Sequence, residues 1–154
     1  MTASHQTRPL APASVTSALG ILRADGHRIS AARRLAIEAL FAAEGPVSAE
    51  EIAGGLEGRL PESDLAALYR NLEVLSEAGL VEHVHVAHGA GRYVLTGRSA
   101  EGWVACEGCH RLKPLERSKA AELRAAIRTA TGFEPAFGHF PLVGRCERCE
   151  EGTA

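Results

Sequence analysis

Hydrophobic residues in the first half of the chain recur at the three- and four-residue spacing of an amphipathic helix. They form four groups: Val15, Ala18, Leu19 and Leu22; Ile37, Leu40 and Phe41; Ile52 and Leu56; and Leu65, Leu68, Leu72 and Leu75. Helix start and stop signals separate the groups. These signals are Gly26, the capping residue Ser30, Gly45-Pro46, a capping box of Ser48 and Glu51, Pro61 to Ser63, and Gly79. The pattern therefore predicts four helices before residue 80.

The pattern changes after Gly79 from helical to strand-like. Residues 80–87 are rich in β-branched residues and histidine, residues 88–91 have the composition of a turn, and residues 92–96 form a second apolar run. This predicts a β-hairpin that follows the helices. Three or four helices followed by a hairpin are typical of a winged helix-turn-helix domain, which we place at residues 14–96.

The second half of the chain predicts a separate small domain. Residues 97–102 have the composition of a hinge. Beyond them we expect strands at 103–105, 112–115 and 140–143, and a helix at 118–131. We place this domain at residues 103–150. Residues 1–13 are expected to form a disordered N-terminal arm, and residues 151–154 a C-terminal tail. The predicted fold class is therefore α+β, with a winged helix followed by a small α+β domain.

Composition and charge narrow the function classes. The chain has 154 residues, 45% hydrophobic and 23% charged, which suits one domain or two small ones and excludes a large multi-layer enzyme. No apolar run is long enough to span a membrane, and the first residues lack a signal-peptide pattern, so we expect a cytoplasmic protein without a membrane partner. The net charge of −2 gives no general support for nucleic-acid binding. Residues 1–34 nevertheless contain five arginines and one acid.

Two pairs of cysteines give the strongest chemical signal. Cys106 and Cys109 form one Cys-x-x-Cys motif, Cys146 and Cys149 form a second, and 36 residues separate the two motifs. In a reducing compartment such pairs bind metal more readily than they form disulfides. Four thiolates make a closed tetrahedral zinc site, which stabilises the fold and leaves no position for catalytic water. The alternative interpretation is a redox-active dithiol switch.

A cluster of histidines indicates a second metal site. His83 and His85 alternate along the predicted strand, so their side chains lie on the same face. His139, just before the second cysteine pair, could complete the site, and Glu82 is a weaker ligand candidate. Histidines in this position could equally contact phosphates or remain solvated.

The fourth predicted helix carries the candidate DNA contacts. Its polar flank presents Tyr69, Arg70 and Asn71, which suit phosphate or base contacts in the major groove. Arg28 and Arg33 could bind the flanking phosphate backbone. The alternative is that these residues form an ordinary solvated helix face.

Taken together, these motifs resemble the ferric uptake regulator family of bacterial metal-dependent repressors, from about Val15 to Cys149. The motifs that carry the resemblance are Arg28-Ile29-Ser30-Ala31-Ala32-Arg33, Leu65-Ala66-Ala67-Leu68-Tyr69-Arg70-Asn71-Leu72, Gly79-Leu80-Val81, Arg92-Tyr93 and the paired cysteines. The resemblance implies a homodimer that binds operator DNA through its winged helix and dimerises through its C-terminal domain. It also implies a structural zinc on the four cysteines and a regulatory metal near the hinge. By position, Tyr69 and Arg70 match the recognition-helix pair, and Arg33 matches an arginine of the second helix.

Within the family the chain is most similar to the nickel-responsive branch. That similarity assigns His83, His85 and His139 to one site for a second divalent metal, zinc or nickel. The chain also departs from the family pattern. Residues 99–103 replace a histidine-rich run, and Gly45, Val94 and Pro114 stand where other members place sensing ligands. The resemblance therefore implies that iron, peroxide or nickel is not sensed through the usual ligands.

These inferences predict a dimeric winged-helix repressor with structural zinc and a second metal site. We expect no enzymatic activity and no small-molecule substrate, because no nucleophile, base and orienting group occur together. One alternative is a family member that has lost metal sensing and is constitutive or answers another signal. Another is an adaptor that uses the winged helix and the zinc site for protein contacts.

Overall fold

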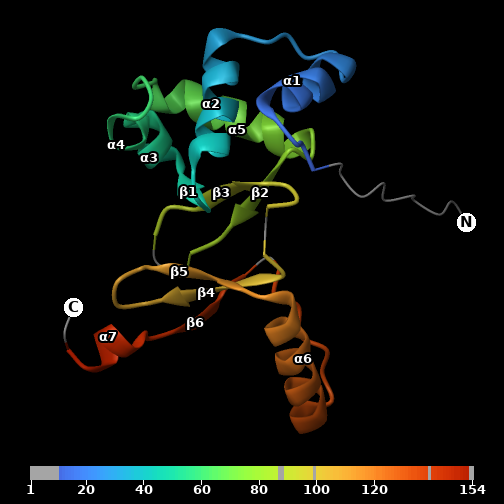
Figure 1. Ribbon diagram of the computed structural model, residues 1–154, viewed down its shortest axis with the longest axis vertical. Helices are drawn as coiled ribbons and strands as arrows, with labels where there is room; N and C mark the ends of the chain where they lie inside the picture. The colour runs from blue at the N-terminus through green and yellow to red at the C-terminus, as the bar shows by residue number, and fades with distance from the viewer. Residues whose placement is uncertain (1–10, 87–88, 99, 139, 153–154) are drawn as a thin grey trace, which may run out of the picture.

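The computed structural model describes residues 11–86, 89–98, 100–138 and 140–152, and its helices agree with the predicted order (Figure 1). The first two helices are α1 (Val15–Ala24) and α2 (Ala31–Ala42). Ser14 caps α1, and the predicted cap Ser30 accepts a hydrogen bond from the backbone N–H of Arg33 at 3.1 Å. The predicted arm at residues 1–13 lies mostly outside the described residues.

The fourth predicted helix is present as expected, whereas the third is shorter than predicted. The capping box of Ser48 and Glu51 opens α3 (Ala49–Ala53) as expected, and Asp64 caps α5 (Leu65–Glu77). The prediction that one helix continues to Leu56 is wrong. The chain instead forms a short turn, α4 (Gly55–Gly58), in which Leu56 and Glu57 have φ values of 50° and 59°. This left-handed backbone ends α3 while still burying the Leu56 side chain.

The wing is a three-stranded antiparallel sheet with the order β1-β3-β2. The predicted hairpin is present as β2 (Val81–Val84) and β3 (Arg92–Leu95), and its register pairs His83 with Tyr93. The third strand, β1 (Val47–Ser48), was not predicted. It consists of two residues that pair with β3 at Tyr93 and Arg92.

The apolar groups predicted from spacing form the core of this first unit. Leu22, Ile37, Ile52, Leu72 and Leu75 are all at most 2% exposed and belong to one cluster. The cluster joins α1, α2, α3 and α5 to the base of the wing. Burying a Leu or Ile side chain contributes roughly 1.5–3 kcal/mol, so this core fixes the orientation of α5.

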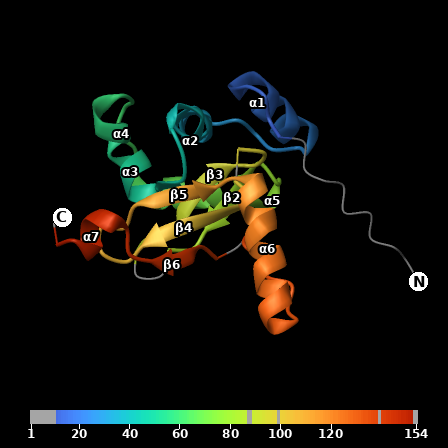
Figure 2. The ribbon, with the colours of Figure 1, turned by 60° about the horizontal axis from the view of Figure 1, so that its bottom comes forward.

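The C-terminal unit has a second sheet with the order β5-β4-β6. Its strands are β4 (Gly102–Cys106), β5 (Leu112–Leu115) and β6 (Leu142–Gly144), and β6 runs parallel to β4. Helix α6 (Arg117–Thr131) starts from one end of the sheet and extends away from it (Figures 1 and 2). A short helix that was not predicted, α7 (Glu147–Glu150), follows β6. No helix in the described parts of the chain is long and apolar enough to cross a membrane.

The two sheets meet through a small apolar cluster. Val84 and Val94 of the wing pack with Trp103 of β4, and all three are at most 6% exposed. Two charged residues of the connecting segment also have partners. Arg98 donates to the carbonyl of Phe41 at 3.2 Å, and Glu101 accepts from Arg124 of α6 at 2.9 Å. The connection is therefore held by contacts on both sides.

Candidate metal centre and nucleic-acid interface

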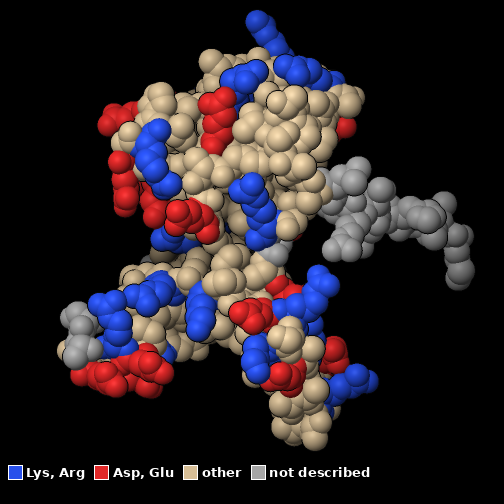
Figure 3. All heavy atoms as spheres, in the orientation of Figure 1, with Lys and Arg blue, Asp and Glu red and all other residues tan. Residues whose placement is uncertain are grey.

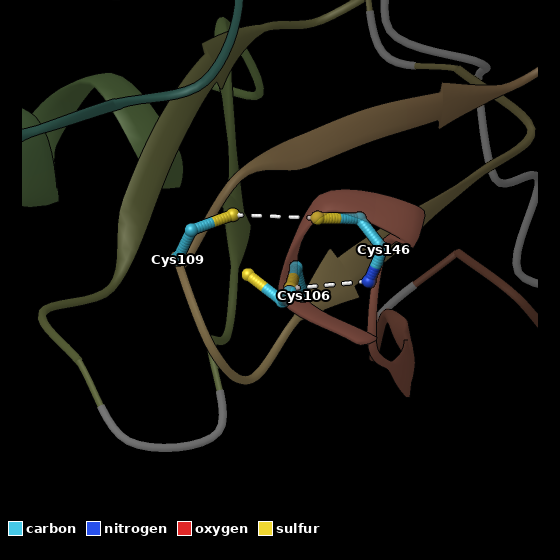
Figure 4. A group of neighbouring side chains, drawn as sticks. Cys106, Cys109 and Cys146 are labelled. Atoms are coloured by element: carbon cyan, nitrogen blue, oxygen red, sulfur yellow. Dashed lines mark hydrogen bonds between the residues drawn. The ribbon is translucent and has the colours of Figure 1, made fainter. Parts of the chain in front are cut away.

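The fold brings the four cysteines together from two separate segments. Cys106 ends β4, and Cys109 follows in the turn to β5. Cys146 directly precedes α7, and Cys149 lies within that helix. Their sulfur atoms all lie within 4.8 Å of one another, and none forms a disulfide. Figure 4 shows the sulfur atoms of Cys109 and Cys146 facing each other from the two segments, 3.8 Å apart.

Backbone N–H groups favour the thiolate form of Cys106. The N–H of Cys146 donates to the sulfur of Cys106 at 3.3 Å. Hydrogen bonds from the backbone of Cys109 and of Cys146 lower the pKa of the Cys106 thiol to about 6. The pKa of Cys149 is raised to about 12, chiefly by its hydrogen bond with the Cys146 side chain. The thiolate is thus favoured at Cys106 and the thiol at Cys149, and binding of a metal ion by all four sulfurs would release the remaining thiol protons.

The geometry of the cluster fits zinc. In a tetrahedral site with Zn–S bonds of about 2.3 Å, the sulfur atoms are roughly 3.8 Å apart. The Cys109–Cys146 separation matches that value, and the remaining separations need only small adjustments. Four sulfur ligands leave no open position, so the site is suited to a structural ion and not to catalysis.

Gly108 allows the two cysteine segments to approach each other. A Cβ atom at this position would lie 2.9 Å from the Cys149 sulfur and 3.0 Å from its Cβ atom. Sequence spacing did not single out Gly108, although its place inside the first Cys-x-x-Cys motif is a signal for close backbone approach.

We expect Gly108→Ala to weaken zinc retention, because the added methyl group pushes α7 away from the first cysteine pair. The half-time of zinc loss to a chromophoric chelator should shorten by about tenfold or more, which corresponds to roughly 1.4 kcal/mol. Gly144→Ala is the matched control, since its Cβ would have no neighbour within 4 Å. Equal zinc loss from both variants would contradict the role given to Gly108.

The wing histidines lie next to each other. The ring centroids of His83 and His85 are 4.3 Å apart, and His83 stacks on Tyr93 at 4.8 Å. The His85 ring stacks on Phe140 at 5.5 Å, which places His85 beside the segment before β6. His139 lies outside the described residues. Glu82 is exposed, and strand alternation turns it to the face opposite His83, so the structure does not bring it to the histidines.

Tyr69 and Arg70 both lie exposed on α5. The Tyr69 side chain is 42% exposed, and its hydroxyl donates to Oε1 of Glu50 in α3 at 2.8 Å. This hydrogen bond raises the pKa of Tyr69 and lowers the pKa of Glu50. The sequence pattern did not point to Glu50, because its contact with α5 depends on how the two helices cross. Both side chains of the pair nevertheless lie on the outer surface of α5.

Asn71 and Arg33, both expected to contact DNA, are hydrogen-bonded within the protein in this structure, and their contact with DNA stays a prediction. Asn71 is 8% exposed and donates to the carbonyl of Ala67 at 2.9 Å. Its Oδ1 accepts from Nε of Arg33 at 3.1 Å. The same guanidinium donates to the carbonyl of Arg28. Arg33 of α2 therefore links α5, through Asn71, with the α1–α2 connection, through the Arg28 carbonyl. The Arg28 side chain itself is exposed.

Charge on the surface is mixed. In the view of Figure 3, basic and acidic side chains are interspersed over both units, and basic side chains lie at the top, over the connection between α1 and α2. This distribution agrees with the small net charge of −2. An electrostatic contact with DNA therefore depends on local arginines and not on the overall field.

The residues that depart from the family pattern gather around one cavity. Gly45, Val94, Trp103 and Pro114 all line a cavity of about 290 Å³ between α2 and the second sheet. Glu101, a carboxylate of the connecting segment, is paired with Arg117 at 3.5 Å and with Arg124 at 2.9 Å. The described part of this region contains no cluster of three or more metal-ligating side chains.

Comparisons with known proteins agree with this architecture. The chain is 26% identical over 142 residues to the peroxide operon regulator of Bacillus subtilis (strain 168). The aligned region covers 92% of this chain and 97% of that protein. The fold is similar to that of the Helicobacter pylori ferric uptake regulator, with a TM-score of 0.72 at 14% identity over 94% of this chain and 99% of the other. The fold is also similar to that of the Vibrio cholerae ferric uptake regulator, with a TM-score of 0.64 at 23% identity. This match covers 82% of this chain and 98% of the other.

A model of the ferric uptake regulator family matches residues 24–138, which include most of both units and the first cysteine pair. The match therefore begins at the end of α1 and spans the rest of the winged helix, the connection and the second unit up to the segment before β6. Proteins of this family are transcription regulators and not enzymes. The chain belongs to the ferric uptake regulator family.

Proposed function

We propose that the protein is a homodimeric repressor that binds operator DNA through α5. The observation that carries this proposal is the exposed pair Tyr69 and Arg70 on a helix whose inner side is held by a hydrogen bond to α2. This is the Arg33–Asn71 hydrogen bond, which ties α5 to α2. A rigid, exposed helix with donors on its outer face is what major-groove binding requires. A repressor that binds operator DNA acts where the chromosome is, so the proposal includes a cytoplasmic location.

The exposed apolar residues of the C-terminal unit support dimerisation there. Phe133 is 76% exposed, Val143 is 52% exposed and Leu123 is 37% exposed. Within α6 only Ala120 is buried, so the helix leaves most of its surface uncovered (Figure 2). A second copy of the chain would cover these side chains, in line with the depletion of large apolar patches on monomeric proteins.

Two metal sites complete the proposal. The four cysteines bind one structural zinc, and His83, His85 and His139 bind a second divalent ion, zinc or nickel. The 4.3 Å contact between the His83 and His85 rings supports the second site, as does the neighbouring Phe140, which precedes β6. An ion there would join the wing to the C-terminal unit. Such a link can favour one spacing of the two recognition helices over others.

Replacement of His83 by Ala is expected to lower the metal content by up to one ion per chain while the cysteine site stays filled. The reason is that two remaining ligands do not hold a divalent ion tightly. Elemental analysis of the purified protein measures this directly, with His27→Ala, on the α1–α2 connection, as a control outside both sites. Unchanged metal content in His83→Ala would show that there is no second site at the wing histidines.

The proposed function is tested by elemental analysis of the purified dimer before and after mild chelation, combined with duplex-DNA binding on each sample. Loss of one of two ions together with loss of DNA affinity identifies a metal-responsive repressor. If one tightly held zinc is found and DNA binding ignores chelation, the regulator has lost metal sensing. Absence of salt-dependent DNA binding would favour the adaptor alternative.

A further inference from the structure

A cavity lies where the winged helix meets the second sheet. It has a volume of about 290 Å³ and is bounded by the C-terminal end of α2, by β3 and by β4 and β5. Leu40 and Ala43 form the α2 side, and Trp103 and Pro114 form the opposite side. The volume is close to the lower end of the range of about 300–1,000 Å³ found for small-molecule sites.

The lining of this cavity does not fit a metal ion. Eight of its ten residues carry no charged or metal-ligating side chain, and Glu44 is the one lining residue of a ligand type. A divalent ion needs three or more such donors. Apolar side chains such as Leu40, Val94 and Trp103 instead suit the body of an apolar molecule.

Arg98 gives the cavity one basic group at its rim. Its Nη1 donates to the carbonyl of Phe41 at 3.2 Å, and its guanidinium lies 4.8 Å from the centre of the Phe41 ring. Because a guanidinium has five N–H donors, this anchored side chain can also receive a carboxylate. Glu44, the other charged lining residue, is exposed and can keep its own carboxylate in water.

We propose that this cavity binds a small apolar carboxylic acid, with its apolar part against Trp103 and its carboxylate at Arg98. Binding of the acid does not depend on the proposed DNA-binding function; its effect on DNA affinity does. A molecule that contacts both Ala43 and Trp103 binds most tightly at one arrangement of the two units. It therefore shifts the population of arrangements, and with it the affinity for DNA.

The chain supplies its own reporter, because Trp103 is its single tryptophan and lines the cavity. Benzoate is the probe, with benzamide as the uncharged analogue of the same shape. We expect benzoate to change the Trp103 emission saturably, with a Kd at or below about 1 mM, and benzamide to bind about tenfold more weakly. Arg98→Gln should remove this difference by weakening benzoate alone.

A second variant tests whether the cavity itself is the site. Gly45 lines the cavity, and a Cβ atom added there would have no neighbour within 4 Å, so Gly45→Leu should fill the space without a backbone clash and abolish the benzoate response. Gly20→Leu is the matched control, because a Cβ atom on this α1 residue would be equally free and Gly20 does not line the cavity. It should bind benzoate like the unmodified protein.

Three results would overturn the proposal. These are no saturable emission change with benzoate, equal binding of benzoate and benzamide, or an unaltered response in Gly45→Leu. The fluorescence titration needs no DNA, so it separates this proposal from the proposed function. If benzoate binds, DNA affinity should change at least fivefold on saturation, whereas a protein that binds no DNA would contradict the repressor assignment and leave the cavity site intact.

Discussion

Replacement of Cys146 by serine is expected to leave the purified protein without its zinc and to unfold the region around β6 and α7. Cys146 directly precedes α7, and its sulfur lies 3.8 Å from that of Cys109. Structural zinc contributes about 10–16 kcal/mol to the folding of zinc-finger peptides. A loss of even half that amount is comparable to the total stability of about 5–15 kcal/mol typical of small proteins. Elemental analysis and thermal melting followed by circular dichroism measure both effects.

The neighbouring residue provides the control. Glu147 is exposed and outside the cluster, so Glu147→Ser should keep one zinc per chain and melt close to the unmodified protein. Titration of accessible thiols adds a second readout, because zinc protects all four cysteines whereas a redox dithiol cycles between oxidised and reduced forms. If Cys146→Ser retains zinc and stability, the cluster is not the structural metal site and the dithiol alternative gains support.

The helices could be predicted from the sequence because the interactions that define them are local. Ser48 and Glu51 are three residues apart, and they bond to each other's backbone N–H groups at 2.7 and 3.1 Å. The cysteine cluster was predictable for a similar reason, since two residues between paired cysteines is a spacing that suits one metal ion. In each case the signal lies within a few residues of sequence.

The elements that were missed depend on distant partners. Strand β1 has two residues and exists because Val47 pairs with Tyr93, 46 positions later in the chain. The turn α4 depends on Gly55, whose Cβ would lie 2.3 Å from the carbonyl oxygen of Leu60. In the sequence alone, the residues of β1 and of α4 look like those of an ordinary loop.

The internal role of Asn71 could have been predicted, since the signal was present. Leu68, Asn71 and Leu72 follow the spacing i, i+3, i+4, and Leu75 continues it at i+7, so Asn71 occupies a position on the apolar face of α5. A buried amide needs hydrogen-bond partners, and Arg33 supplies one. The identity of that partner was not predictable, because it comes from another helix 38 positions away.

Removal of the Arg70 side chain is expected to weaken binding to the preferred operator by about 1–3 kcal/mol, roughly 5- to 150-fold, if the guanidinium reads a base. Arg70 is exposed on α5 beside Tyr69, and Asn71 braces the same turn from the inside. The operator is first selected from a pool of random duplexes with the unmodified protein. Arg70→Ala is then compared by fluorescence anisotropy on that duplex and on duplexes with single base changes.

Two control variants separate base reading from general attraction to DNA. Arg28→Ala, at an exposed position on the α1–α2 connection, should weaken binding equally on all duplexes and reduce the salt slope by about 1, as a phosphate contact does. Arg128→Ala, on α6 in the other unit, removes an arginine that pairs with Glu134 and should leave DNA binding unchanged. A role for Arg70 in base recognition requires both weaker binding and relaxed sequence preference. If Arg70→Ala matches the Arg128 control, α5 does not read the operator through Arg70.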